Sequence, residues 1–338
     1  MEDFVKRRPL WSLVIVVLAA VLLWLILAPW PPELSAKWGR KQIFLNALFG
    51  GITLGALYFL VAAGFTLIFG LMRVVNLAHG SLFLLGGYLG YEVSTATGSW
   101  FLAFPVVFVV VGLLGLLMQR FIFTKMEGEE LRQTLVSIGI SIVLADLMLW
   151  YWGGQSYSIL APEFLQGPVE LPIVSAVNAT TGAVTWLRYP SVRIWILAAA
   201  IVIGVAMWLV LNRTALGMLI RAGVDDREML AASGVRIQLV FLAVFGFGAG
   251  LAGMAGIIGG TFQSLSPGED TRFLLASLVV VIVGGMGSIV GAAVGALVIG
   301  VTEQMGFVYA PTYSIVFTFL VMAAVLAFRP QGLLGAGR

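Results

Sequence analysis

The feature that most constrains this chain is a series of apolar runs, each long enough to cross a membrane as a helix. The hydrocarbon core of a bilayer is about 30 Å thick, so a helix needs about 20 apolar residues to cross it. Only helices and closed barrels satisfy their backbone hydrogen bonds there. Runs of this length indicate helical spans at 10–30, 43–70, 100–119, 134–153, 192–211, 238–261 and 312–328.

Two further apolar stretches are interrupted. Residues 80–95 form a shorter run after a polar break at 73–79, and 273–305 is too long for one crossing and contains Gly284-Gly285-Met286-Gly287-Ser288. Broken helices of this kind occur where backbone is buried in protein or lines a watery cavity. The sequence therefore predicts an all-α polytopic membrane protein with about nine to ten transmembrane segments and broken helices near 73–80 and 284–288.

Composition excludes an ordinary soluble domain. Hydrophobic residues make up 60% of the 338 residues and charged residues only 10%, against about 45–50% and about 25% in soluble domains. We therefore expect residues 1–338 to form one membrane domain. The chain has no cysteine and one histidine, so the sequence predicts no disulfide, no thiol chemistry and no metal site.

The lysines and arginines predict which side each loop faces. Ten crossings put both termini on one side, and if that side is the cytoplasm, the inner segments hold thirteen of the nineteen basic residues. This agrees with the positive-inside rule. The loop 155–190 then faces outward, where it can meet an extracellular partner, and the loop 212–236 faces the cytoplasm.

The inner loop 212–236 contains signals for a short helix of its own. Asp225 can cap its start, Glu228 completes a capping box three residues later, and Gly234 supplies a left-handed stop. Two interpretations remain open: a helix resting on lipid headgroups, or a docking helix for a cytoplasmic protein. The mixed charge favours the protein partner, because lipid-binding helices are usually basic on their polar face.

Polar residues at the breaks and inside the spans are candidates for a transport pathway. Asn76 and His79 lie at the first break, and Asp146 and Glu303 lie inside apolar runs, where an aspartate costs about 2.5–3.5 kcal/mol. Structural alternatives remain open, because His79 can bond a freed carbonyl, Asp146 a neighbouring helix, and Glu303 can reach the interface. Gly284 and Gly285 permit the second break, while three glycines after it are spaced for tight helix packing: Gly291, Gly295 and Gly300.

Four sequence blocks occur in a fixed order along residues 43–335. They are Val75-Asn76-Leu77-Ala78-His79-Gly80, Arg221-Ala222-Gly223-Val224-Asp225-Asp226 running on to Ala231-Ala232-Ser233-Gly234-Val235, Val283-Gly284-Gly285-Met286-Gly287-Ser288-Ile289, and Arg329-Pro330-Gln331-Gly332-Leu333-Leu334-Gly335. These blocks resemble permease subunits of the branched-chain amino acid (hydrophobic amino acid uptake) family of bacterial ABC importers, of the type with an Asn-x-Ala-His-Gly block. The span 10–30 is additional to that type, and the loop 155–190 is specific to this chain.

The resemblance implies a transport subunit of the bacterial inner membrane without catalytic residues or a bound cofactor. Its expected partners are a second related permease, two cytoplasmic ATP-binding subunits that hold ATP and Mg²⁺, and a periplasmic solute-binding protein. The expected solutes are branched-chain or other hydrophobic amino acids, or related small molecules such as urea, amides and aromatic acids. We expect coupling to the ATPases at Arg221, Asp225, Asp226, Glu228, Ala231 and Gly234, and a translocation pathway at Asn76, His79, Asp146, Gly284, Gly285 and Glu303.

Two other function classes fit the sequence less well. The chain lacks the Gly-x-x-x-x-Gly-Lys-Ser/Thr loop, so any ATP must be hydrolysed by another polypeptide. An ion-coupled secondary transporter or a channel for a small polar solute is the alternative, but carriers usually place several acids in their spans. A membrane enzyme would need an acid and base pair, a nucleophile triad or a metal cluster, and none can be assembled from these residues.

Overall fold

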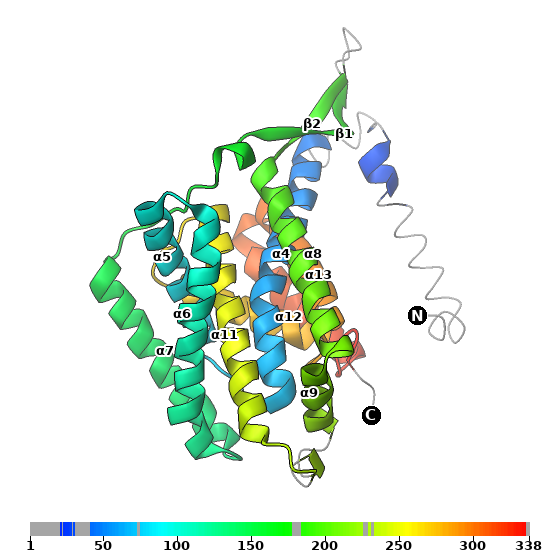
Figure 1. Cartoon of the computed structure of the whole chain (residues 1–338). Coiled ribbons are helices and arrows are strands. Elements are labelled where there is room, and N and C mark those ends of the chain that lie inside the picture. Colours follow the sequence, from blue (N-terminus) through cyan, green and yellow to red (C-terminus); the bar gives the residue numbers. More distant parts are fainter. Residues whose placement is uncertain are drawn as a thin grey trace.

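Helix α4 lies at the centre of the bundle (Figure 1). It covers Lys41–Met72, and 89% of its most apolar stretch is buried. It packs most extensively against α13 (Ile289–Tyr309) and α11 (Ile237–Phe262), and also against α8 (Ser191–Arg213) and α12 (Glu269–Gly284). A helix that is buried on all sides needs no polar face, which explains why α4 is apolar all round.

This computed structural model describes residues 21, 23–28, 30, 41–72, 75–177, 184–225, 229–230 and 233–335. Besides the five helices above, its elements are α5 (His79–Thr97), α6 (Trp100–Phe121), η1 (Phe123–Met126), α7 (Glu130–Trp152), η2 (Glu163–Leu165), β1 (Pro168–Val177), β2 (Val184–Pro190), α9 (Ala215–Asp225), η3 (Pro311–Tyr313) and α14 (Ser314–Phe328). The helices α5, α6 and α11 form one side of the bundle, with α7 outside them (Figure 1).

Glycines decide how closely α4 approaches α13. A Cβ on Gly55 would lie 2.8 Å from the carbonyl oxygen of Ala296, and a Cβ on Gly300 would meet the backbone of Gly55 even more closely. Lipid is as apolar as the side chains, so helices associate in membranes through close van der Waals packing of small residues. The packing role that the sequence predicts for Gly300 is therefore confirmed.

The described residues contain seven helices that are long and apolar enough to cross a membrane: Lys41–Gly70, Trp100–Met126, Glu130–Trp152, Ser191–Arg213, Ile237–Phe262, Ile289–Tyr309 and Pro311–Phe328. The helices α5, with 19 residues, and α12, with 16, are not among them. Both predicted breaks are confirmed, because α4 ends at Met72 and α5 begins at His79, while α12 ends at Gly284 and α13 begins at Ile289. Most of the predicted first span, 10–30, lies outside the described residues.

Part of the predicted outer loop folds as a β-hairpin, which the all-α prediction missed. Strands β1 and β2 pair antiparallel, and Glu170 lies opposite Arg188 with a 3.0 Å ion pair. The Tyr189 hydroxyl lies 2.6 Å from Thr53 Oγ1 and donates to the carbonyl of Phe49, which anchors the hairpin on α4. The segment contains β-branched and aromatic residues, which favour strands, and its period-2 pattern is too short to stand out among the long apolar runs.

Replacing Gly300 with valine should destabilise the protein, because the new Cβ would meet the α4 backbone and force α4 away from α13. Overpacking of this kind costs about 1–3 kcal/mol. Thermal unfolding of the purified chain in detergent measures the effect. Gly139→Val is the matched control, because Gly139 lies on the outer helix α7 and a Cβ added there would have no other atom within 4 Å. Equal melting temperatures for the two variants would contradict the packing role.

Candidate functional site

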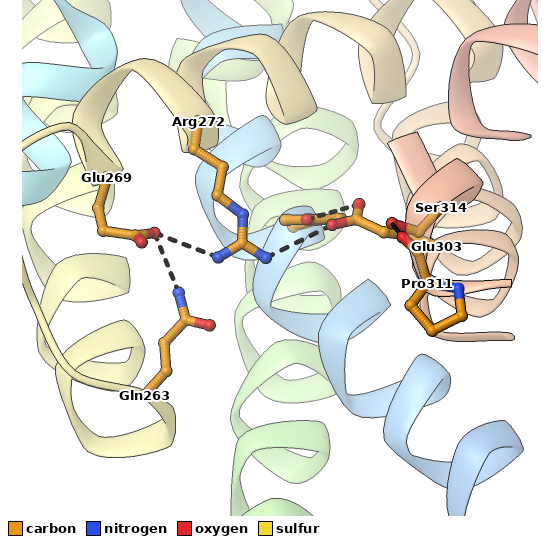
Figure 2. A network of polar contacts seen from close by, with 7 residues as sticks. Gln263, Glu269, Arg272, Glu303, Pro311 and Ser314 are labelled. Atoms are coloured by element: carbon orange, nitrogen blue, oxygen red, sulfur yellow. Dashed lines mark hydrogen bonds and ion pairs between the residues drawn. The ribbon is translucent and has the colours of Figure 1, made fainter. Parts of the chain in front are cut away.

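A cluster of charged side chains lies at the start of α12. Arg272 Nη1 donates to Glu269 Oε2 at 3.4 Å, one helical turn before it, and Arg272 Nη2 donates to Glu303 Oε1 on α13, also at 3.4 Å. Figure 2 shows the guanidinium between the two carboxylates. One arginine thus connects two helices that are separated by a turn in the chain.

Two neutral side chains complete this cluster. The Tyr58 hydroxyl on α4 donates to Glu303 Oε2 at 2.8 Å, and Gln263 Nε2, just after α11, donates to Glu269 Oε2 at 3.2 Å. The five side chains, here called the Arg272 cluster, therefore connect α4, α12 and α13 with the end of α11. Arg272 also lies over the Phe273 ring, with its Cζ 5.8 Å from the ring centroid.

The Arg272 cluster is partly open to its surroundings. The Arg272 side chain is 45% exposed, while those of Glu269 and Glu303 are 19% and 18% exposed. Ionisable groups in the membrane pair with one another and normally face the interior of a bundle or a watery cavity. With one guanidinium and two carboxylates, the cluster carries an excess of one negative charge.

A second polar contact lies on the buried side of the same helix end. Asp270 is buried, and its Oδ2 accepts from Ser81 Oγ on α5 at 3.4 Å. Ser81 Oγ in turn lies 2.7 Å from Ser141 Oγ on α7. The first turn of α12 is therefore held by polar contacts on both sides, towards α13 through Arg272 and towards α5 and α7 through Asp270.

Asn76 and His79 are buried in the core and do not reach the Arg272 cluster. Asn76 Oδ1 accepts from the Ala78 backbone N–H at 3.1 Å, an Asx turn that shapes the break before α5. The His79 ring is fully buried, with Nε2 3.0 Å from the carbonyl oxygen of Val61 on α4 and an edge-to-face contact with Phe65. These contacts give His79 a structural role, but the carbonyl that it contacts lies within α4 and not at the helix break.

Gly284 and Gly285 meet the C-terminal segment 329–335. The backbone N–H groups of Leu333 and Leu334 donate to the carbonyls of Val283 and Gly284 at 2.8 and 3.0 Å. Gly285 has a φ of 111°, and a Cβ there would lie within contact distance of the Gly335 backbone. Two of the sequence blocks thus form one structural unit at the C-terminal end of α12, here called the C-terminal clasp.

Asp146 lies apart from all of these residues. Its side chain is exposed on α7, and α7 packs mainly against α5 and η1 at the edge of the bundle (Figure 1). The structure therefore does not bring Asp146 together with Glu303. The sequence could not distinguish the positions of these two acids, because hydropathy does not report the direction in which a side chain points.

The inner loop is described in part. Arg221 on α9 donates to the carbonyl of Leu211 and to Asn212 Oδ1, which braces α9 against the end of α8. Gly234 has a φ of 86°, so the left-handed helix stop predicted there is confirmed. Asp225 is the last residue of α9, and its predicted capping of the next helix stays a prediction because Asp226, Glu228 and Ala231 lie outside the described residues.

Arg272, Glu269 and Tyr58 are absent from the sites predicted from the sequence. A signal was present for two of them, because Glu269 and Arg272 are spaced one helical turn apart directly before an apolar run. Tyr58 had no such sequence signal, because it is one aromatic residue within an apolar helix. Among the described residues, no group of three or more His, Asp and Glu side chains could hold a metal ion.

Residues 47–326 match the family described as branched-chain amino acid transport system permease component. The chain is 28% identical over 304 residues to the branched-chain amino acid transport permease protein BraD of Pseudomonas aeruginosa, covering 86% of this chain and 96% of BraD. It is 27% identical over 305 residues to the permease protein LivH of Escherichia coli, with the same coverage. A shorter match is the ribose import permease protein RbsC of Haemophilus influenzae, 27% identical over 250 residues and 71% of each chain. No solved structure matches the chain significantly.

Replacing Gly285 with alanine should loosen the C-terminal clasp, because the methyl group would meet the Gly335 backbone and the positive φ disfavours alanine. We expect faster chymotrypsin cleavage after Leu333 and Leu334, the two clasp residues, in the purified chain. Gly128→Ala is the matched control for backbone strain, since Gly128 has a φ of 86° with nothing within 4 Å. Equal cleavage rates in the two variants would show that the clasp does not depend on this contact.

Proposed function

The chain belongs to the family of branched-chain amino acid transport permease components, and from this premise we propose that it forms the translocation pathway of an ABC importer for branched-chain amino acids. The observation that carries the proposal is the match to such permeases over 86% of the chain and 96% of their length. This match favours an ABC permease over the ion-coupled carrier or channel. Within the ABC importer assignment, the alternative to a branched-chain amino acid is a related small solute such as urea or an amide.

A permease of this family is a transport subunit rather than an enzyme. In our proposal, ATP and Mg²⁺ are bound by two cytoplasmic ATP-binding subunits, because this chain has no phosphate-binding loop. A periplasmic solute-binding protein delivers the solute, and a second related permease completes the membrane part. The outer loop 155–190, with its β-hairpin, is the proposed contact for the solute-binding protein.

The arrangement of the bundle supports the proposed orientation. Helix α9 and the C-terminal end of the chain lie towards one end of the bundle, and the β-hairpin lies at the opposite end (Figure 1). This is the separation expected if 212–236 and both termini are cytoplasmic, as the basic residues indicate. Counting α5, α12 and the predicted span 10–30 with the seven long helices gives the proposed ten transmembrane segments.

We assign coupling to the ATP-binding subunits to the segment from Arg221 to Gly234, which also contains Asp225, Asp226, Glu228 and Ala231. Arg221 braces α9 against α8, so a push on α9 reaches a transmembrane helix directly. The left-handed Gly234 ends the segment and leads into α11, which packs against α4. Motion of this segment would therefore be passed to both sides of the central helix.

Replacing Asp225 and Glu228 together with alanine should uncouple ATP hydrolysis from transport while leaving the chain folded. Loss of charge and local capping in one loop costs about 0.5–2 kcal/mol, too little to unfold the bundle. In proteoliposomes that contain the complete importer, we expect ATP-driven uptake of labelled leucine to be lost and association of the ATP-binding subunits to weaken.

The control for this variant is Glu129→Ala with Glu130→Ala, which removes two acids from another predicted inner loop. Normal association, hydrolysis and uptake in the Asp225 and Glu228 variant would contradict the coupling role. Leucine uptake by the wild-type chain without the ATP-binding subunits would instead contradict the ABC assignment itself.

A further inference from the structure

The charged end of α12 lies at membrane depth. The 16 residues of α12 span about 24 Å, less than the roughly 30 Å of the hydrocarbon core. Its other end is held by the C-terminal clasp, and the clasp directly follows Pro311–Phe328, which is long and apolar enough to cross the membrane, so that end lies near one membrane surface. The start of α12, with Glu269 and Arg272, therefore stops short of the opposite surface.

Glu303 lies at a similar depth on the neighbouring helix. It precedes the last residue of α13, Tyr309, by six residues, or about 9 Å of helix. The exposed guanidinium of Arg272, next to the exposed Thr271 and Leu275, cannot face lipid without a large cost. The open side of the Arg272 cluster must therefore face water or a polar molecule.

The hydrogen bonds of Arg272 allow its guanidinium to exchange one carboxylate partner for another. Its two terminal nitrogens contact two different carboxylates, each at 3.4 Å. A bidentate pair with a single carboxylate is shorter and stronger, so a solute carboxylate can compete for the guanidinium. Glu303 would stay in position when released, because Tyr58 still donates to its other oxygen at 2.8 Å.

From these observations we propose that the Arg272 cluster is a solute-contact site in the translocation pathway, in which Arg272 binds the carboxylate of an α-amino acid and Glu303 binds its ammonium group. Glu269 remains beside Arg272 and holds the guanidinium in place, with Gln263 orienting Glu269. This inference rests on the proposed transport function and adds the residues and the chemistry of solute contact.

A zwitterionic solute leaves the net charge of the cluster unchanged at minus one. An amino acid replaces the pair between Arg272 and Glu303 with two new pairs, so no charge is left without a partner. A carboxylic acid without the amino group would put three carboxylates around one guanidinium. The site should therefore favour leucine over 4-methylpentanoate, which has the same carbon skeleton without the amino group.

The absence of cysteine from the chain allows a direct test. In Thr271→Cys, the only thiol of the chain lies beside Arg272, and a methanethiosulfonate reagent modifies it only where water allows the thiolate to form. In proteoliposomes with the complete importer, we expect the thiol to react and leucine to slow the reaction several-fold. We expect 4-methylpentanoate to leave the rate unchanged. Val202→Cys, exposed in the middle of α8, is the lipid-facing control and should not react.

Second-site variants test which residues bind the solute. Adding Glu303→Gln to Thr271→Cys should abolish protection by leucine, and adding Arg272→Lys should weaken it, because lysine keeps the charge but lacks the planar fork. Glu129→Gln is the matched control, because Glu129 forms the same kind of ion pair with Arg132 three residues later, at 3.2 Å on the surface. It should leave protection unchanged.

The outcomes separate this inference from the proposed function. No reaction at Thr271→Cys, no protection by leucine, equal protection by 4-methylpentanoate, or full protection in Glu303→Gln would each overturn the solute-contact site. Uptake of leucine driven by ATP is measured in the same vesicles. Normal uptake without protection overturns the site and leaves the transport function standing, whereas absence of uptake by the wild-type importer overturns the transport function.

Discussion

The close approach of α13 to the central helix α4 is the contact on which the rest of this structure depends. Gly55 on α4 and Gly300 on α13 face each other with no room for a side chain between the backbones. In lipid, where apolar side chains gain little by leaving the solvent, such close packing is what holds helices together. Because α4 also contacts α8, α11 and α12, its position relative to α13 sets the geometry of the whole bundle.

The same contact positions the polar groups. Helices α4 and α13 run antiparallel, since Gly51 meets Gly300 and Val301 while Gly55 meets Ala296. Tyr58 and Glu303 lie on opposite sides of the glycine contact, and because side chains in a helix lean towards its N-terminus, these two lean towards each other. The tight glycine contact therefore brings the Tyr58 hydroxyl within hydrogen-bonding distance of the Glu303 carboxylate. A carboxylate with a fixed donor is a defined partner for Arg272, so the apolar packing of two helices determines the geometry of a charged cluster.

Helix α12 is held differently at its two ends. The C-terminal clasp fixes one end through backbone hydrogen bonds to Leu333 and Leu334. The other end is held by the side-chain contacts of Arg272 and Asp270 and by close packing of Gly80 on the Asp270 backbone. Side-chain ion pairs can exchange partners while backbone pairing persists, so the charged end is the one suited to contact a passing solute, and the clasp keeps the helix in register while it does so.

Local patterns in the sequence were enough to determine much of this protein. Run length predicted the long spans, the Gly284-Gly285 pair predicted the turn before α13, and the left-handed stop at Gly234 followed from glycine itself, because each of these depends on residues within a few turns of one another. The β-hairpin was missed, since its short alternation is weak beside the long apolar runs.

The candidate site was decided by tertiary structure alone. The sequence shows Glu303 as an acid within an apolar run, but its partner Arg272 lies 31 residues away and meets it only because α12 and α13 pack side by side. Asp146 looked equivalent in sequence, yet α7 turns it outward at the edge of the bundle. Hydropathy measures how apolar a helix is and not which way each residue faces, so the sequence determined which segments enter the membrane, and the packing of the helices decided which polar residues meet there.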